Sequence, residues 1–213
     1  PVIEQTDMVC ALDFYVLEQV CMDIRDWLRR GIQPIKVSVN FSRKHLTNHN
    51  LAEDIMQVLR KYNVDSKYIE IELTETVDEE EAGLLIDFMN KMRKYNILMT
   101  IDDFGTGYSS LSLLTRMPMD TIKIDKSFVD RIDSQKEHAN ECVVLRYMIG
   151  MLKELGFTCL AEGAEDKAQI EKLREYGCEI VQGFYYSKPL PVEEYEALIE
   201  RDGHVQSGSK FEK

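Results

Sequence analysis

Side chains with oxygen atoms recur in this sequence wherever a short β-branched stretch gives way to a helical one. These side chains are Asn40, Glu72, Asp102, Asp103 and Glu162, and two further strand-like stretches carry Lys123 and Gln182 at comparable positions. The carboxyl ends of parallel strands meet at one edge of a sheet, and (β/α) barrels build their active sites at that edge. The pattern therefore predicts an enzyme site.

The adjacent carboxylates Asp102 and Asp103 form the sharpest motif. Two carboxylates at a strand end can bind two divalent cations when one of them bridges the ions, an arrangement that cleaves phosphodiesters. Gly105 and Gly107 allow the following loop to fold tightly over the site. For an isolated Asp-Asp-x-Gly segment, the alternative is an Asx turn that caps the next helix. The other strand-end carboxylates favour the metal site.

The remaining candidates have ordinary structural alternatives. Lys123 either forms a salt bridge with a neighbouring carboxylate or places a positive charge at a phosphoryl oxygen or an attacking water. Asn40, taken alone, could be a turn residue that ends its strand. Glu72 shares a strand face with Glu70, so one of them could be solvated, but an unpaired carboxylate inside a barrel is costly. This favours a functional role for Glu72, while Glu162 is a candidate base or ligand.

The predicted donor set favours Mg²⁺ or Mn²⁺ over Zn²⁺, because it consists of oxygen atoms. The four histidines lie in helical or loop segments, where we expect them to face solvent; they are His45, His49, His138 and His204. The five cysteines are scattered and have no C-x-x-C spacing. They indicate buried thiols in a reducing cytoplasm, and they argue against a zinc site or a disulfide framework.

Composition narrows the class of protein further. The chain has 213 residues, which suits one domain, and 38 acidic against 26 basic residues give a net charge of −12. This charge argues against DNA or RNA as a partner, and an anionic substrate would need divalent cations beside the carboxylates. No apolar run approaches the ~20 residues that span a bilayer, and residues 1–5 do not resemble a signal peptide. We therefore predict a cytoplasmic location, and Pro1 in place of a methionine predicts a fragment.

Short β-branched stretches alternate with longer amphipathic ones along the chain. The predicted strands are 35–40, 69–73, 97–101, 121–124, 158–161 and 179–182, and the predicted helices are 7–30, around 51–59, 79–95, 111–115, 137–155, 166–176 and 192–201. This alternation indicates βαβ units and a parallel sheet. Because a closed barrel has eight strands, we predict an α/β fold of the (β/α)₈ type that lacks its first two strands in this chain.

Two finer predictions concern the ends of the chain. In the helix 7–30 we expect the inward face to carry apolar side chains, namely Leu12, Val16, Val20, Trp27 and Leu28. The barrel domain is predicted to span 1–201, and the polar residues 202–213 are predicted to form a loose tail.

Six motifs together resemble the EAL domain family of bacterial cyclic di-GMP phosphodiesterases, from about residue 1 to residue 198. They are Ser38-Val39-Asn40-Phe41-Ser42, Glu72-Leu73-Thr74-Glu75, the run from Asp102 to Ser110, Lys123-Ile124-Asp125, Ala161-Glu162-Gly163-Ala164-Glu165 and Gln182-Gly183-Phe184. The resemblance implies a modified (β/α)₈ barrel that opens cyclic di-GMP to linear pGpG with two Mg²⁺ or Mn²⁺ ions.

The resemblance also implies a role for each matching residue. Asn40, Glu72 and Asp102 would bind metal, and Asp102 would bridge to a second ion held partly by Asp103. Lys123 and Glu162 would orient or deprotonate the nucleophilic water, and Gln182 and Asp125 would lie on the substrate side. Glu75 would anchor the loop 106–110, which in such domains couples the metal site to a dimer interface. The implied partners are cyclic di-GMP, a second copy of the chain, and upstream GGDEF or sensor domains, through which a membrane tether is possible.

The sequence departs from the family pattern in three places. The Glu-Ala-Leu segment, whose glutamate is a metal ligand, would lie before Pro1, so we expect this chain alone to bind metal poorly. Ala164 replaces the usual valine, and Lys188 replaces an arginine before Pro189. Two alternatives stay open: a non-catalytic cyclic di-GMP receptor, and a different barrel hydrolase such as a glycosidase. Edges left by missing strands would favour self-association.

Overall fold

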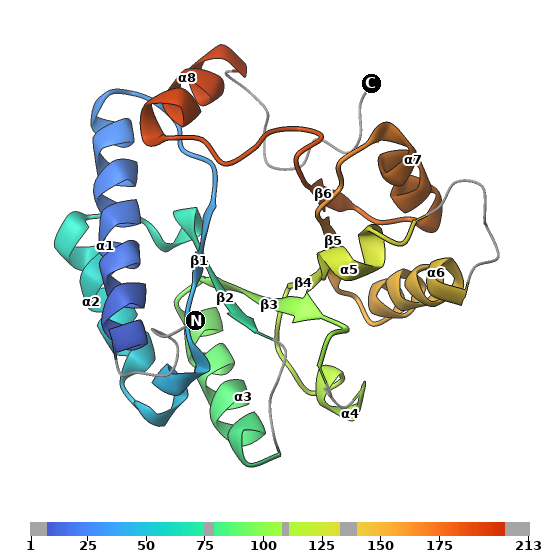
Figure 1. Ribbon diagram of the computed structural model, residues 1–213. Coiled ribbons are helices and arrows are strands. Elements are labelled where there is room, and N and C mark those ends of the chain that lie inside the picture. Colours follow the sequence, from blue (N-terminus) through green and yellow to red (C-terminus); the bar gives the residue numbers. More distant parts are fainter. Residues whose placement is uncertain (1–7, 75–78, 108–110, 133–139, 203–213) are drawn as a thin grey trace.

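The sheet positions everything else in this protein. The computed structural model describes residues 8–74, 79–107, 111–132 and 140–202. Within these ranges, six strands form one sheet in sequence order: β1 (Val37–Asn40), β2 (Ile69–Thr74), β3 (Leu98–Phe104), β4 (Thr121–Ile124), β5 (Thr158–Glu162) and β6 (Ile180–Gln182). Every neighbouring pair is parallel, and Figure 1 shows the strands curved into an arc. The predicted parallel α/β architecture is confirmed.

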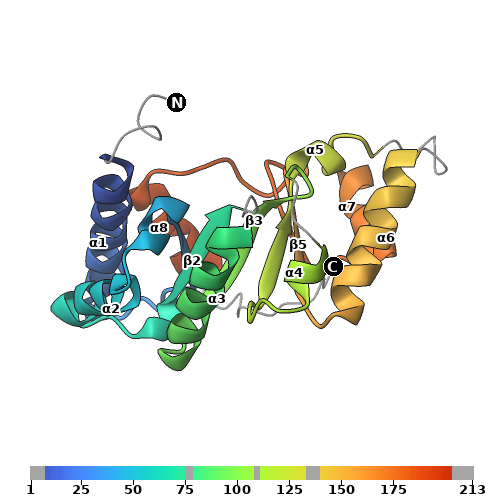
Figure 2. The ribbon, with the colours of Figure 1, turned by 90° about the horizontal axis from the view of Figure 1, so that it is seen from below.

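Helices cover the outer side of this arc (Figures 1 and 2). The described residues form the helices α1 (Met8–Arg29), α2 (Leu51–Tyr62), α3 (Glu79–Lys94), α4 (Leu111–Leu114), α5 (Lys126–Val129), α6 (Asn140–Glu154), α7 (Lys167–Tyr176) and α8 (Val192–Asp202), with short 3₁₀ turns η2 (Arg43–Thr47) and η3 (Ser66–Tyr68). The helix α7 is preceded by Asp166, which forms a capping box with Gln169, and it is followed by the C-cap Gly177, whose φ of 84° suits glycine.

The hydrophobic core lies between the sheet and the helices. Side chains alternate between the two faces of a strand, and one set of alternate positions is apolar and almost fully buried: Val39, Ile71, Ile101, Ile122 and Ala161. The opposite set faces the inside of the arc and is mostly polar, as in Ser38, Glu70 and Thr100. The Glu70 carboxylate forms a salt bridge of 3.6 Å with Lys36 and accepts a hydrogen bond from Thr100. The polar and charged side chains of the sheet are therefore concentrated on its inner face.

The buried face of α1 differs from our prediction. Leu12 and Val16 are 44% and 39% exposed, whereas Leu17, Cys21 and Ile24 are fully buried. The helix carries apolar residues on two faces, and helical periodicity alone does not say which face meets the sheet. Trp27 is buried, as predicted.

Four of the five cysteines are buried, and Cys10 is partly exposed.

The segment that follows β6 crosses the open side of the arc, and the C-terminal helix α8 lies beside α1 (Figure 1). The indole Nε1 of Trp27 donates to Glu196 Oε1 at 2.8 Å, and Arg30 Nη1 lies 2.7 Å from Glu196 Oε2. Both contacts lower the pKa of Glu196, the Arg30 hydrogen bond most of all.

Residues after 202 lie outside the described part of the chain, so the domain limit at residue 201 and the tail 202–213 stay predictions. None of the described helices combines the length and apolar character that crossing a bilayer requires.

Replacing Glu196 with alanine is expected to loosen α8 from α1 and to shift tryptophan fluorescence to longer wavelength. Trp27 is the sole tryptophan of the chain, so its emission reports directly on whether water reaches this contact. Glu193→Ala, which removes an exposed glutamate of the same helix, is the matched control and should leave the spectrum unchanged. An unchanged spectrum in Glu196→Ala would show that other contacts hold α8.

Candidate functional site

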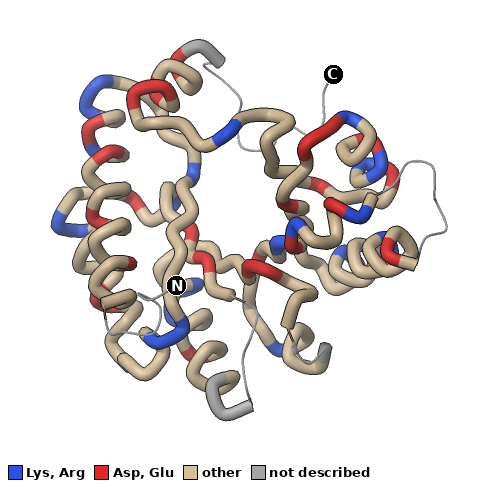
Figure 3. The backbone as a smooth tube through the Cα atoms, viewed as in Figure 1, with Lys and Arg blue, Asp and Glu red and all other residues tan. Residues whose placement is uncertain are grey.

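The predicted site residues that lie in the described part of the chain are at or near the carboxyl ends of the strands. Asn40, Glu162 and Gln182 are the last residues of β1, β5 and β6. Asn40 lies opposite Glu72 in the β1–β2 register, and Glu162 lies opposite Gln182 in the β5–β6 register. Figure 3 shows acidic positions along the inner side of the arc in addition to those on the outer helices.

Lys123 connects three carboxylates that come from three different strands. Its Nζ lies 2.9 Å from Glu72 Oε2, 3.1 Å from Asp102 Oδ1 and 2.6 Å from Glu162 Oε1. The Lys123 side chain is 7% exposed, and those of Glu72 and Glu162 are 8% and 20% exposed. The salt bridge considered from the sequence therefore exists, and it ties β2, β3, β4 and β5 together at the site.

Asp103 reaches the same site as Asp102 through a distortion of β3. Neighbouring residues of a regular strand point to opposite faces, yet oxygen atoms of Asp102, Asp103 and Glu162 lie within 4.8 Å of one another. The β3–β4 register shifts between Ile101 and Phe104, and Asp103 has a φ of 55°. Bulges of this kind turn a side chain toward an active site, and the left-handed backbone lets both carboxylates converge.

Burial and charge shape the protonation of the site. Burial opposes the charged form of Lys123, but hydrogen bonds to Glu162 and Glu72 and the charge of Asp102 raise its pKa. For Glu162, burial raises the pKa most; Lys123 lowers it, and Asp102 and Glu72 raise it further. Lys123 thus carries a proton at neutral pH, while Glu162 is a stronger base than an exposed glutamate.

The donor chemistry of Asp102, Asp103 and Glu162 fits a hard divalent cation. Carboxylate oxygens are the ligands that Mg²⁺ and Mn²⁺ prefer, and these carboxylates converge closely enough to share an ion. This group contains Glu162, which the sequence suggested as a base, beside two of the predicted metal ligands. Glu72 joins the group through Lys123.

A cleft of about 480 Å³ lies beside the carboxylate cluster. It is lined by Lys126, Glu162, Gly163, Glu165, Gln182, Gly183, Phe184, Ser187, Lys188, Pro189, Leu190, Tyr195 and Leu198. Gln182 lies in its wall, and Lys188 Nζ is 5.8 Å from the Phe184 ring centroid. Gly183 must be glycine, because an added Cβ would lie 2.1 Å from the backbone oxygen of Ala164. The cleft thus combines an aromatic ring and cations with the edge of the acidic site.

Two of the predicted site residues stand differently from the rest. Asp125 caps the N-terminus of α5, since its Oδ1 accepts the backbone N–H of Ser127 at 3.0 Å. A contact with substrate would therefore use the lone pairs that this hydrogen bond leaves available on the carboxylate. Glu75 lies outside the described residues, as do residues 108–110 of the loop that it was predicted to anchor.

The prediction that His45 faces solvent is wrong. His45 is 5% exposed, and its Nε2 lies 3.0 Å from Asp13 Oδ2. Burial lowers the pKa of His45, and the hydrogen bond to Asp13 opposes that effect. Asp13 was not among the residues predicted from the sequence. A carboxylate between Val9 and Leu17 on one helical face indicates a special role, because such a position is normally apolar.

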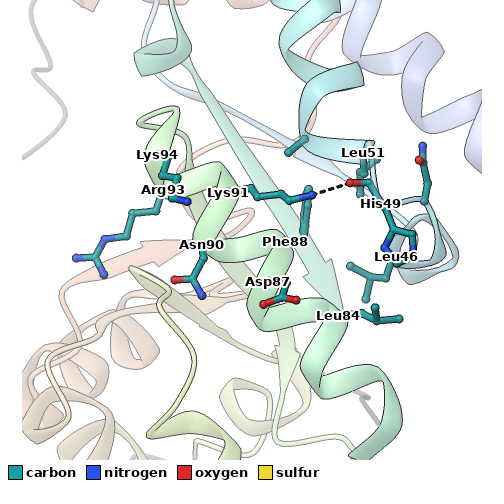
Figure 4. Close-up of a pocket in the computed structure, with 12 residues that line it drawn as sticks. Leu46, His49, Leu51, Leu84, Asp87, Phe88, Asn90, Lys91, Arg93 and Lys94 are labelled. Atoms are coloured by element: carbon teal, nitrogen blue, oxygen red, sulfur yellow. Dashed lines mark hydrogen bonds between the residues drawn. The ribbon is translucent and has the colours of Figure 1, made fainter.

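A larger hollow of about 650 Å³ lies on the helical side of the sheet (Figure 4). It is lined by Leu46, Asn48, His49, Leu51, Ala52, Leu84, Asp87, Phe88, Asn90, Lys91, Arg93 and Lys94. Its cations lie in the last turn of α3, where positive charge complements the helix dipole, and Lys91 Nζ donates to the His49 carbonyl at 2.7 Å. Leu46, Leu51 and Phe88 are at most 6% exposed. This hollow contains none of the predicted site residues.

Comparison with known proteins gives consistent matches. A family model described as the EAL domain matches residues 1–189. The cyclic di-GMP phosphodiesterase NbdA of Pseudomonas aeruginosa is 32% identical over 196 residues, which cover 92% of this chain and 25% of that protein. The probable cyclic di-GMP phosphodiesterase PdeB of Escherichia coli is 36% identical over 197 residues, which cover 92% of this chain and 36% of that protein. The chain spans about a quarter of NbdA and about a third of PdeB.

Solved structures agree with the sequence matches. The PaMucR phosphodiesterase in complex with c-di-GMP has a TM-score of 0.82 at 28% identity, covering 92% of this chain and 78% of that one. The EAL domain of Mycobacterium smegmatis DcpA has a TM-score of 0.79 at 28% identity, covering 88% and 83%. These likenesses confirm the resemblance drawn from the motifs.

Proposed function

Because the chain belongs to the EAL domain family, we propose that it forms the catalytic domain of a metal-dependent phosphodiesterase that hydrolyses cyclic di-GMP to linear pGpG. The observation that carries the proposal is the contact of Lys123 with Glu72, Asp102 and Glu162 beside the Asp102–Asp103 bulge. The donor set supports Mg²⁺ or Mn²⁺ as the cofactor.

The proposed roles follow from charge and position. Asn40, Glu72, Asp102 and Asp103 would hold two ions, which when bound supply charge neutralisation and an acidified water. Glu162 would take a proton from the water molecule while the water oxygen attacks phosphorus. Lys123 would orient that water and offset the charge that develops on the phosphoryl oxygens. The bond from phosphorus to the 3′-oxygen would break, the 3′-oxygen would take a proton from solvent water, and Glu162 would release the proton it accepted to solvent. The product would keep a 5′-phosphate.

The cleft beside Glu162 and Gln182 supports a site for one guanosine half of the substrate. Phe184 offers a ring on which a base can stack, and Lys188 offers a cation for a phosphate. Gln182 and Asp125 are the residues to which we assign substrate contacts. Glu75 would couple the metal site to a homodimer interface, and GGDEF or sensor domains elsewhere in the protein would regulate turnover in the cytoplasm.

The decisive experiment measures pGpG release from cyclic di-GMP by the protein purified at its natural length. We expect turnover with Mn²⁺ or Mg²⁺, loss of turnover in EDTA, and recovery when the metal is returned. Isothermal titration calorimetry with cyclic di-GMP separates binding from hydrolysis. Tight binding with no pGpG at saturating metal would overturn the proposal and would identify a receptor domain instead.

A further inference from the structure

The helix α1 reaches the turn that follows Asn40 through one buried carboxylate. Asp13 is 9% exposed, and its Oδ2 accepts the backbone N–H of Ser42 at 2.7 Å. The same oxygen lies 3.0 Å from His45 Nε2. A carboxylate only accepts hydrogen bonds, so His45 carries its proton on Nε2 and donates to Asp13. One oxygen of α1 therefore holds both ends of the 42–45 segment.

Other contacts hold the same turn on its remaining sides. The backbone N–H of Phe41 donates to the Glu72 carbonyl at 2.9 Å, and Ser42 Oγ caps η2 by accepting the Lys44 N–H at 3.3 Å. The Phe14 ring packs edge-on against Phe41 and His45, with centroids 5.5 Å and 5.4 Å apart. The backbone after Asn40 is thus fixed between α1 and β2.

Asp13 is poorly explained as a residue that only attaches α1. A carboxylate amid the buried residues Val9, Leu17 and Cys21 carries a desolvation penalty that an apolar residue would avoid. The helix has an independent polar attachment in Glu18, which contacts Lys61 Nζ at 2.9 Å and Tyr62 OH at 3.0 Å. What distinguishes Asp13 is its hydrogen bond to the backbone N–H of Ser42, two residues after the predicted metal ligand Asn40.

We propose that Asp13 is a positioning residue that acts through the Ser42 N–H and His45 to aim the Asn40 side chain at the metal site. The inference rests on the proposed function, since the aim of Asn40 affects metal binding only if the site binds metal. Partners of this outer kind typically change metal affinity by ~10–100-fold, and the indirect route through the backbone places Asp13 at the lower end, about tenfold.

The test compares Asp13→Ala and Asp13→Asn with the matched control Glu18→Ala in the natural-length protein. Three quantities are measured: the Mn²⁺ dissociation constant by electron paramagnetic resonance, the melting temperature in EDTA, and the nuclear magnetic resonance signal of the Asn40 side-chain amide. We expect Asp13→Ala to weaken Mn²⁺ binding about tenfold and to shift the Asn40 signal, with partial rescue in Asp13→Asn. Glu18→Ala should lower the melting temperature without either effect.

Each outcome bears on one proposal. Unchanged Mn²⁺ affinity and an unchanged Asn40 signal in Asp13→Ala overturn the positioning role, as does an equal loss of Mn²⁺ affinity in Glu18→Ala. A wild-type protein that binds no Mn²⁺ overturns the proposed function instead. In that case the Asn40 signal decides the inference, because it responds to the turn and not to the metal. Should Asp13→Ala fail to fold, Asp13→Asn and His45→Gln are compared with Glu18→Ala, and an unchanged Mn²⁺ affinity together with an unchanged Asn40 signal in both variants overturns the positioning role.

Discussion

Replacing Lys123 with methionine is expected to destabilise the metal-free protein by about 3–5 kcal/mol, because removing one partner of a buried ion pair leaves uncompensated charge. Three carboxylates from β2, β3 and β5 face this ammonium at 2.6–3.1 Å, and methionine replaces the unbranched stem of lysine but lacks its charged terminal group. For a domain of this size, the loss corresponds to a fall in melting temperature of roughly 6–20 °C.

Metal should restore part of this loss. Mg²⁺ or Mn²⁺ can supply the positive charge that the variant lacks, so the melting temperature of Lys123→Met is expected to depend more strongly on metal than that of the wild type. Differential scanning fluorimetry in EDTA and in Mg²⁺ measures both. Lys61→Met, which removes a 58%-exposed lysine from its ion pair with Glu18, is the control and should lower the melting temperature far less, because exposed ion pairs stabilise weakly. A variant as stable as wild type in EDTA would refute the role of Lys123 as the central cation.

The pH range of the Lys123 contribution follows from the sign of its shift. The pKa is raised above the ordinary value of 10.5 in the folded state, so the folded protein holds this proton more tightly than the unfolded chain does. The stabilisation is therefore fully present below about pH 10.5 and is lost as pH rises through the folded-state pKa. The comparison of variants at pH 7–8 is made where the contribution is complete.

Replacing Glu162 with glutamine is expected to lower kcat for cyclic di-GMP hydrolysis by ~10²–10⁴-fold, the usual contribution of a general base. Glutamine keeps the shape of the side chain and an oxygen for Lys123, but it does not take a proton from water. Burial raises the pKa of Glu162, so a neutral side chain suits this environment, and we expect the fold and the affinity for cyclic di-GMP to be preserved. Steady-state kinetics and calorimetry separate the two effects.

A measurement of metal affinity distinguishes the two roles open to Glu162. Its oxygen lies within 4.8 Å of oxygens from Asp102 and Asp103, so it is placed to bind metal as well as to accept a proton. Loss of kcat with unchanged Mn²⁺ affinity indicates a base, and a parallel loss of both indicates a ligand. Glu171→Gln on α7, where the carboxylate is 64% exposed and pairs with Lys167, should alter neither. Wild-type kcat in Glu162→Gln would contradict both roles.

Local sequence determined the order of the elements and the set of residues at the strand ends. Strand and helix periodicities are properties of a few neighbouring residues, so the alternation of β-branched and amphipathic stretches predicted the parallel sheet. Parallel strands align their carboxyl ends, and this geometry alone placed Asn40, Glu72, Asp102 and Glu162 at one edge. The pair Asp102–Asp103 and the family motifs could also be identified from the sequence, because each consists of neighbouring residues.

Tertiary structure decided what depends on contacts between distant segments. The choice between two apolar faces of α1 came from packing against the sheet and α2. The convergence of Asp103 with Asp102 required a bulge, because a regular strand would have sent the two side chains to opposite faces. Lys123 meets Glu72 across 51 residues, and Asp13 meets His45 across 32. Local periodicity carries no information about such pairs, since they form only where the whole fold brings the strands and α1 together.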